Sequence, residues 1–191
     1  MCIRDRDNVE KFIESLSDKI EAIAVMGGTT VSSELIKKLP KLKIIANYGV
    51  GYDAVDVKQA TLSNVKVTNT PDVLNDEVAD TAIALTLCVY KNIALANQFL
   101  LEKKWLKSEY PLSKKFSGTK FGILGMGRIG KTIAKRIESF NCEICYHSRN
   151  QKDVKYKYFS KLEDLAEYVD TLCVITPCLL YTSPSPRDSS E

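Results

Sequence analysis

The sequence has little net charge and no long hydrophobic run. Its 27 basic and 24 acidic residues leave a formal net charge of +3, and the basic residues are scattered along the chain. Charge therefore gives no reason to expect nucleic acid or a membrane surface as a partner. The longest apolar run, residues 81–90, has about half the length that crosses a bilayer, and we predict a buried helix there. Residues 1–20 lack the apolar core of a signal peptide.

Histidine is scarce, and closely spaced cysteines are nearly absent. The chain has one histidine, His147, and its six cysteines include one close pair, Cys142 and Cys145. Residues three apart on a strand point to opposite faces, so this pair should form neither a disulfide nor a metal site, and we predict no metal. Free thiols favour a reducing compartment, and we expect a cytoplasmic protein. Cys88 and Cys173 lie in apolar runs and are predicted to be buried.

The two ends of the chain resemble a sequencing adapter. Residues 1–6 (MCIRDR) and 178–188 (CLLYTSPSPRD) back-translate to the two strands of one transposon-end adapter. We therefore expect residues 1–6 and 178–191 to be artefacts and residues 7–177 to be the natural segment, cut at both ends. The alternative for the tail is a natural flexible segment rich in serine and proline.

Short apolar segments alternate with amphipathic ones between these ends. Brief, largely apolar runs are typical of strands covered on both faces of a parallel sheet. They occur at residues 22–26, 43–46, 65–68, 120–124, 143–146 and 172–175. Helical patterns separate them at residues 33–38, 55–60, 76–90, 129–140 and 161–168. The alternation predicts an α/β doubly wound fold. In the helix 76–90, Asn75 is expected to be the cap, with Asp76 and Glu77 at the positive end.

A polar stretch over residues 101–118, which contains a proline, separates two strand–helix series. We predict a first domain over residues 7–92, a connecting helix and linker over residues 93–117, and a second domain over residues 118–177. The connecting helix is expected to cover residues 92–103 and to cross between the domains. Trp105 in the linker is expected to pack against the fold.

The strongest chemical signal is the glycine motif Gly125-x-Gly127-x-x-Gly130. A predicted strand enters the motif and a predicted helix leaves it, which is the arrangement that binds the pyrophosphate of a dinucleotide. Gly125 would allow the tight turn, Gly127 the approach of the pyrophosphate, and Gly130 the close packing of helix on strand. The N–H groups at the start of the helix would attract the phosphates. The alternative is a glycine-rich turn in another kind of α/β protein.

The residues after the next predicted strand bear on the choice of cofactor. An acidic residue usually reads the ribose about 20 positions beyond the glycine loop. Here Ser148 takes that position, and residues 147–152 contain no carboxylate. Ser148 offers a hydroxyl, and Arg149 and Lys152 offer positive charge, which suits the 2′-phosphate of NADP. We therefore predict NADP as the preferred cofactor. The alternative is a solvated basic turn that also accepts NAD.

A second loop, residues 47–53 (NYGVGYD), follows a predicted strand. The glycines on either side of Val50 would let backbone N–H groups face a small carboxylate without side chains in the way. A purely structural turn explains the same residues equally well.

Four segments in this order resemble the D-isomer-specific 2-hydroxyacid dehydrogenase family. They are residues 39–56 (LPKLKIIANYGVGYDAVD), residues 65–87 (VKVTNTPDVLNDEVADTAIALTL), Trp105 and residues 117–140 (SGTKFGILGMGRIGKTIAKRIESF). Residues 146–152 (YHSRNQK) are most similar to the NADP-type loop of the glyoxylate/hydroxypyruvate reductase branch. The resemblance implies a flavodoxin-like substrate domain without its first strand, a truncated Rossmann domain, an active site between them, and a homodimer formed through the cofactor domains.

The resemblance also assigns roles to individual residues. The backbone N–H groups of Val50 and Gly51 would hold the substrate carboxylate, and Leu74 and Val78 would lie near the nicotinamide. The other residues expected to line the cofactor are Gly125, Gly127, Arg128, Ile129, Gly130, Ser148, Arg149, Asn150, Lys152, Thr176 and Pro177. The family's catalytic arginine, carboxylate and histidine come after the position of Pro177, so no catalytic residue is assigned within the chain. His147 lies beside the expected ribose site and is not expected to be the catalytic acid.

These expectations define a function for the whole protein. It would be an oxidoreductase that transfers a hydride from NADPH to the carbonyl of a small 2-keto acid, such as glyoxylate or hydroxypyruvate, and gives the D-2-hydroxy acid. The chain as given, without the catalytic histidine, is expected to be inactive. The alternative is an NAD(P)-sensing regulator or corepressor, since this fold also serves binding roles.

Overall fold

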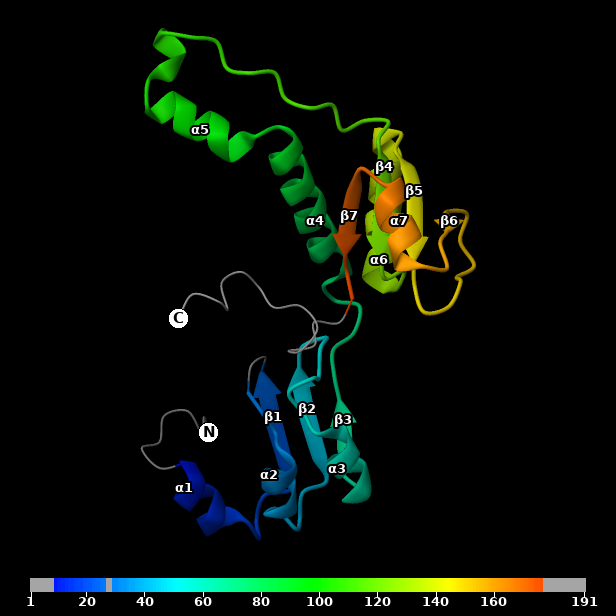
Figure 1. The fold of residues 1–191 in the computed structure, drawn as a ribbon. Coiled ribbons are helices and arrows are strands. Elements are labelled where there is room, and N and C mark those ends of the chain that lie inside the picture. Colours follow the sequence, from blue (N-terminus) through cyan, green and yellow to red (C-terminus); the bar gives the residue numbers. More distant parts are fainter. Residues whose placement is uncertain (1–8, 27–28, 177–191) are drawn as a thin grey trace. The chain divides into compact units, whose positions relative to one another are not determined.

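The computed structural model describes residues 9–26 and 29–176, and the chain forms two compact units that divide between Val73 and Leu74 (Figure 1). Each unit is built on a parallel β-sheet. The predictions for residues 1–6, Pro177 and residues 178–191 lie outside the described residues.

The first unit contains a three-stranded sheet in the order β1-β2-β3. Its strands are β1 (Ala22–Met26), β2 (Ile44–Tyr48) and β3 (Lys66–Thr68), and its helices are α1 (Val9–Leu16), α2 (Ser33–Lys37) and α3 (Val57–Leu62). The hydroxyl of Ser32 accepts a hydrogen bond from the N–H of Leu35 and so starts α2, and the carboxylate of Asp56 does the same for α3. The core includes Ile45 from the central strand, with Ile36 and Ala60 from the two helices. The three strands therefore lie where the apolar runs predict them, within two residues at each end.

The second unit contains a four-stranded sheet in the order β6-β5-β4-β7. Its strands are β4 (Lys120–Leu124), β5 (Glu143–His147), β6 (Lys157–Tyr158) and β7 (Thr171–Val174). Its helices are α4 (Asn75–Tyr90), α5 (Ile93–Leu101), η2 (Lys104–Leu106), α6 (Arg128–Ile137), η3 (Glu138–Phe140) and α7 (Leu162–Tyr168). The chain runs outward from β4 through β5 to β6 and then returns to the other side of β4. This is the 3-2-1-4 strand order of a dinucleotide-binding sheet, so the predicted parallel α/β fold is confirmed.

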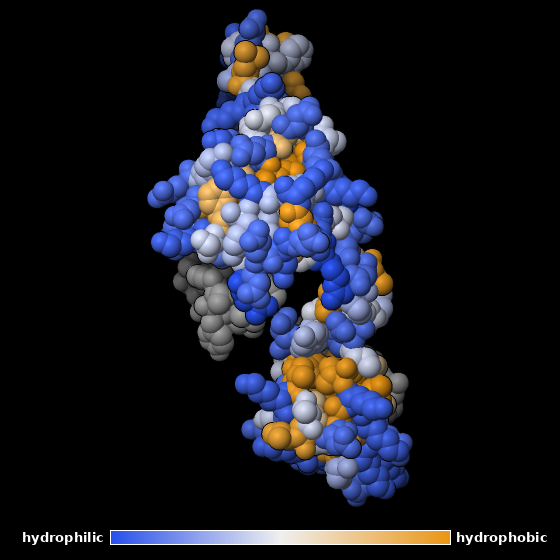
Figure 2. Space-filling view, turned by 90° about the vertical axis from the view of Figure 1, so that its right-hand side faces the viewer, coloured by the Kyte–Doolittle hydropathy of each residue, from blue (hydrophilic) through white to orange (hydrophobic). Residues whose placement is uncertain are grey.

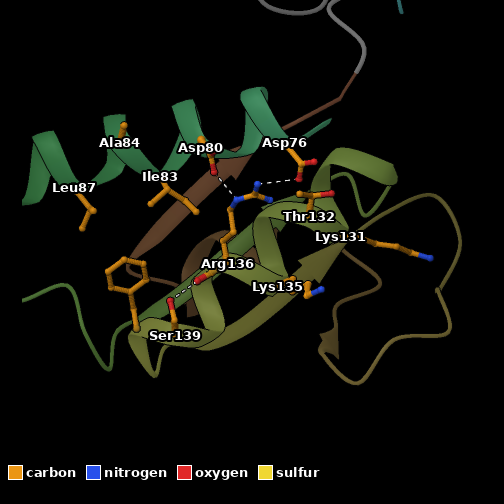
Figure 3. A pocket seen from close by; sticks show the side chains of 11 residues that line it. Asp76, Asp80, Ile83, Ala84, Leu87, Lys131, Thr132, Lys135, Arg136 and Ser139 are labelled. Atoms are coloured by element: carbon orange, nitrogen blue, oxygen red, sulfur yellow. Dashed lines mark hydrogen bonds and ion pairs between the residues drawn. The ribbon is translucent and has the colours of Figure 1, made fainter. Parts of the chain in front are cut away.

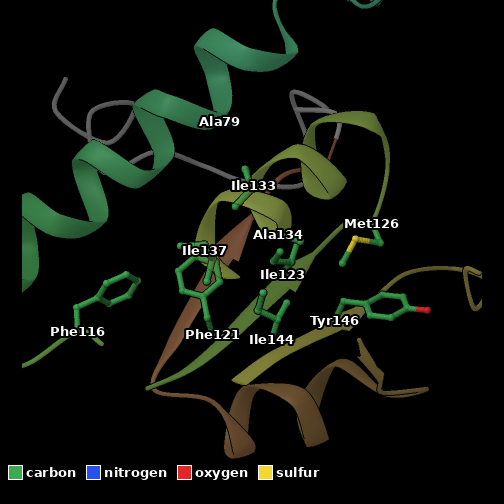
Figure 4. Packing of buried hydrophobic residues seen from close by; sticks show 10 residues of the cluster. All are labelled: Ala79, Phe116, Phe121, Ile123, Met126, Ile133, Ala134, Ile137, Ile144 and Tyr146. Carbon is green, nitrogen blue, oxygen red and sulfur yellow. The ribbon is translucent and has the colours of Figure 1, made fainter. Parts of the chain in front are cut away.

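The core of the second unit lies between β4, β5 and the helix α6, with α4 beside it (Figure 4). Phe121 and Ile123 of β4 are buried against Ile133 and Ile137 of α6. Alternate residues of the strand thus face the helix, because successive side chains on a strand point to opposite faces. Ala79 brings α4 into the same core.

The division between the units lies earlier in the chain than the predicted boundary at Asn92. α4 packs along α6, and α5 continues within the same unit, so the connecting helix that we predict over residues 92–103 does not link the units. The chain passes from one unit to the other at Val73 and Leu74. The apolar face of a helix shows that the helix packs on something, but it does not show on which sheet.

α4 is less buried than its apolar sequence predicts. Ala79 is its buried residue, whereas Leu85 and Val89 are 63% and 74% exposed. Cys88 is exposed as well, so the prediction that it is buried is wrong. These side chains lie on the part of the helix that α6 does not cover.

Two smaller expectations about α4 and the following segment are also wrong. α4 begins at Asn75 itself, and its cap residue Leu74 makes no side-chain capping bond, although Asp76 and Glu77 do lie in the first turn. Trp105, expected to pack against the fold, is 56% exposed in η2.

Within the described ranges, no single helix is long and apolar enough to span a membrane. α4 and α5 pass that test only as a pair, by length and composition, across a bend of 56°. Core helices of soluble proteins give the same result, so the pair carries no further conclusion.

Cys88, Cys142, Cys145 and Cys173, the cysteines among the described residues, are free thiols. Cys145 is fully buried in β5, and burial raises the pKa of its thiol to about 11. Cys173 in β7 is half-buried, less than we predict, and burial raises its pKa too. Cys142 and Cys145 form no disulfide, as their spacing predicts.

Candidate functional site

The candidate cofactor site lies where three neighbouring strands of the second unit end. Leu124 at the end of β4 pairs with His147 of β5 and with Val174 of β7. The N–H of Gly125 donates to the carbonyl of His147 over 2.9 Å, and the N–H of Ile175 donates to the carbonyl of Leu124 over 2.9 Å. The segments that follow these strands therefore meet at one edge of the sheet. In parallel α/β sheets, ligands bind at such an edge, where the strand order reverses.

Gly125 and Gly130 are required by the packing of this edge. Gly125 has φ +107°, and a Cβ added to it would lie 2.6 Å from the carbonyl oxygen of Ile175. A Cβ on Gly130 would overlap the carbonyl oxygen of Gly125. These two glycines hold the turn and the helix close to the strands, as the motif predicts.

Gly127 differs from them because nothing in the protein requires it. A Cβ at this position would meet no atom within 4 Å, and the residue is exposed at the start of α6. Arg128 beside it is exposed and Ile129 is half-buried. The bare backbone at the N-terminus of a ten-residue helix is what the pyrophosphate of a dinucleotide needs. These residues fit such a cofactor.

The turn after β5 presents the polar residues predicted to choose between cofactors. Ser148 is half-buried and its hydroxyl donates to the carbonyl of Asn150 over 2.7 Å. Arg149, Asn150 and Lys152 are exposed. Residues 147–152 carry two permanent positive charges and no carboxylate, and Asp153 follows them. Thr176, also exposed, follows β7 on the other side of β4.

His147 is held in a structural position. Its Nδ1 lies 2.9 Å from the carbonyl oxygen of Phe159, and its ring stacks on Tyr158 with an interplanar angle of 8°. It ends β5, beside the turn just described.

Leu74 and Val78 lie at the start of α4, in the same unit as the glycine motif, where Leu74 is exposed and Val78 is half-buried. Arg136 of α6 fixes this end of α4, because its guanidinium contacts Asp76 over 2.9 Å and Asp80 over 2.5 Å (Figure 3). The hydrogen bond that Arg136 donates to Asp76, with Asp80 beside it, raises the pKa of Arg136. The spacing of the two acids at i and i+4 on one helix face is the sequence signal that could have indicated this contact.

A groove between α4 and α6 is lined by these charged residues and by Ile83, Leu87 and Phe140 (Figure 3). None of the residues predicted to bind cofactor lines it. The groove therefore does not mark the cofactor site, which is an open edge of the sheet.

The loop after β2 in the first unit is held by two asparagine side chains. Asn47 is 6% exposed, and its amide donates to the carbonyls of Gly49 over 3.1 Å and Gly51 over 2.8 Å. The amide of Asn69 donates to the carbonyl of Val50 over 2.9 Å. The sequence analysis missed all three contacts, and that of Asn69 joins segments 19 positions apart.

With the carbonyls fixed in this way, the N–H groups of Val50 and Gly51 take part in none of the hydrogen bonds among the described residues. The loop therefore offers two neighbouring donors on a fixed backbone. Such an arrangement suits a small anion.

Comparison with known proteins shows the family to which the chain belongs. A sequence profile described as D-isomer specific 2-hydroxyacid dehydrogenase, catalytic domain, matches residues 2–173. The chain belongs to this family.

Curated relatives include a glyoxylate/hydroxypyruvate reductase from Arabidopsis thaliana, 40% identical over 166 residues that cover 86% of this chain and 53% of the relative. A glyoxylate reductase from Pyrococcus horikoshii is 37% identical, covering 83% of this chain and 51% of that protein. The chain thus spans about half the length of the curated relatives it matches.

Solved structures agree in fold. A 2-hydroxyacid dehydrogenase from Ketogulonicigenium vulgare has a TM-score of 0.85 and 35% identity, covering 91% of this chain and 55% of that one. The NADPH-dependent glyoxylate/hydroxypyruvate reductase SmGhrB from Sinorhizobium meliloti, solved with NADP and malonate, has a TM-score of 0.77 and 42% identity, covering 85% and 51%.

Proposed function

We propose that the full-length protein carrying this segment is an NADPH-dependent reductase of small 2-keto acids such as glyoxylate and hydroxypyruvate. The observation that carries the proposal lies at one edge of the second sheet. There the glycine loop, in which nothing covers the backbone of Gly127, adjoins the turn of residues 147–152, which contains Arg149 and Lys152 but no carboxylate. The NADP complex of SmGhrB and the names of the relatives support it. The regulatory alternative has no support among the relatives described above.

Each part of the proposed site would have a separate task. The N–H groups at the start of α6 would hold the pyrophosphate, and the turn with Ser148, Arg149, Asn150 and Lys152 would hold the 2′-phosphate. Leu74 and Val78 would give an apolar contact to the nicotinamide. When bound, NADPH supplies the hydride for the carbonyl carbon.

The N–H groups of Val50 and Gly51 would hold the carboxylate of the 2-keto acid. A substrate held by that carboxylate keeps its neighbouring carbonyl at a fixed distance from the loop. The acid that protonates the carbonyl oxygen would come from the part of the relatives that this chain does not span. We propose that His147 is not this acid, because Phe159 and Tyr158 hold its ring beside the cofactor turn.

The cofactor preference is testable with the substitution Ser148→Asp. The wild-type full-length protein should reduce glyoxylate or hydroxypyruvate with a kcat/KM roughly 10- to 100-fold higher for NADPH than for NADH, because one or two charge-assisted bonds to the phosphate are at stake. Ser148→Asp should move the preference towards NADH, since a carboxylate repels the 2′-phosphate and accepts from a free 2′-hydroxyl. Steady-state kinetics with both cofactors measures this.

Two outcomes would contradict the proposal. Equal or better efficiency of the wild type with NADH would remove the predicted cofactor preference. The absence of reduction of any small 2-keto acid with either cofactor would remove the proposed activity. Ser139→Asp, the same substitution at an exposed position beyond the far end of α6, is the matched control and should leave the ratio of the two efficiencies closer to the wild-type ratio.

We also propose that the full-length protein is a homodimer whose interface covers the exposed apolar residues of α4, α5 and η2. Apolar patches interrupt a largely polar surface on the face drawn in Figure 2. Large apolar side chains that are exposed along these three helices are Leu85, Val89, Ile93, Leu95, Leu100, Leu101, Trp105 and Leu106. Exposed apolar side chains that gather on one segment are typical of a protein–protein interface.

Leu101→Glu should weaken this dimer. Leu101 is 75% exposed, and burial of a leucine in an interface contributes about 2 kcal/mol, so introducing a charge there should raise the dimer dissociation constant by more than roughly 30-fold. Leu62→Glu, at an 81% exposed position of α3 in the first unit, should leave the dimer intact. Sedimentation velocity over a concentration series distinguishes these results, and a monomeric wild type would refute the proposal.

A further inference from the structure

The hydroxyl of Tyr146 closes the turn that carries the proposed phosphate ligands. Tyr146 is a residue of β5 with 0% exposure, and its ring lies 5.3 Å from that of Tyr158. Its hydroxyl accepts a hydrogen bond from the N–H of Lys152 over 2.9 Å and donates one to the carbonyl of Lys152 over 3.1 Å. Both hydrogen-bonding groups of one backbone residue are thus bound to one buried side chain.

The turn is held at its other end as well. The hydroxyl of Tyr158 donates to the carbonyl of Ser148 over 3.3 Å, and the hydroxyl of Ser148 donates to the carbonyl of Asn150 over 2.7 Å. Neither the guanidinium of Arg149 nor the ammonium of Lys152 takes part in a hydrogen bond or ion pair among the described residues. The backbone is fixed while the two cations stay available.

We propose that Tyr146 is a positioning residue for cofactor specificity: its hydroxyl fixes residues 148–152 in the form that receives the 2′-phosphate. The proposal rests on the proposed preference for NADPH. A turn that is already ordered loses less conformational freedom when it binds a ligand, so its affinity is higher. The benefit applies mainly to the phosphate, because NADH presents at this turn only a 2′-hydroxyl and no charge for the cations to bind.

The substitution Tyr146→Phe tests this, since it removes one oxygen atom and keeps the buried ring. In the full-length protein, we expect the dissociation constant and KM for NADPH to rise roughly tenfold, as for the loss of one or two hydrogen bonds. The dissociation constant for NADH and kcat at saturating NADPH should change less than about twofold. Fluorescence titration with each cofactor in the absence of keto acid gives the affinities, and steady-state kinetics gives KM and kcat.

Tyr90→Phe is the matched control. The hydroxyl of Tyr90 makes a 2.7 Å hydrogen bond with the hydroxyl of Thr171 in the same unit, away from the turn. Its loss should leave the ratio of the NADPH and NADH affinities unchanged. Tyr158→Phe, which loses the weaker bond to Ser148, should shift the ratio in the same direction as Tyr146→Phe and by less, and it carries the test if Tyr146→Phe proves unfolded in a thermal melt.

The result also separates this inference from the proposed function. A wild type that prefers NADPH, together with Tyr146→Phe affinities that fall equally for both cofactors or do not change, would overturn the role of Tyr146 alone. A wild type without preference for NADPH would overturn both.

Discussion

Gly127→Val is expected to abolish cofactor binding while the fold stays intact. The structure gives the added side chain room, since no atom beyond the neighbouring residues of the chain lies within 4 Å of a Cβ at this position, and the backbone there is extended with φ −84° and ψ −159°. The free energy of unfolding should therefore change by less than about 1 kcal/mol. The valine would occupy the surface that the pyrophosphate approaches at the start of α6.

The expected loss of affinity is large. Displacing the pyrophosphate from two N–H donors removes charge-assisted bonds of about 1.5–3 kcal/mol each, so the dissociation constant for NADPH should rise at least roughly 100-fold. Calorimetric titration of the full-length protein measures it, and chemical denaturation measures stability. Lys135→Val, an exposed position two turns further along α6, is the control and should bind normally. Normal NADPH binding by a folded Gly127→Val protein would mean that the cofactor does not use this loop.

The sheets could be predicted from the sequence because local composition determines them. The runs at Ala22–Met26 and Lys120–Leu124 are strands with those bounds, since short, continuously apolar runs are typical of parallel strands. Coverage on both faces holds for β4, whereas Val25 is the buried residue of β1. β6 has two residues and α1 is a short helix near the chain end, and neither was predicted. Segments this short give too few residues for a periodic pattern.

The glycine motif could also be predicted, because Gly125 and Gly130 meet local steric demands that only the absence of a Cβ satisfies. The side chains that hold the two loops in place could not be predicted. Asn69 acts on Val50 across 19 positions of sequence, and Tyr146 acts on Lys152 only because the chain turns back on itself after β5. The division of the chain could not be predicted for a related reason, since the apolar sequence of α4 does not show which unit the helix packs against.

Gly125→Ala is expected to destabilise the second unit more than any other alanine substitution at its glycines with positive φ. Two costs act together. The residue has φ +107°, which L residues rarely adopt, and the new Cβ would lie 2.6 Å from the backbone oxygen of Ile175, which cannot rotate away as a side chain could. Strain and overpacking each cost about 1–3 kcal/mol, so a loss of about 3–5 kcal/mol in the free energy of unfolding is expected.

Gly118→Ala separates the two costs. Gly118 also has a positive φ, +82°, but nothing lies within 4 Å of an added Cβ, so only the backbone strain of about 1 kcal/mol should appear there. Urea denaturation of both variants of the full-length protein measures the difference, which is the cost of pushing β7 away from the turn after β4. If Gly125→Ala were no more destabilising than Gly118→Ala, the turn would be able to relax. The close approach of Ile175 would then not be what requires glycine at the first position of the motif.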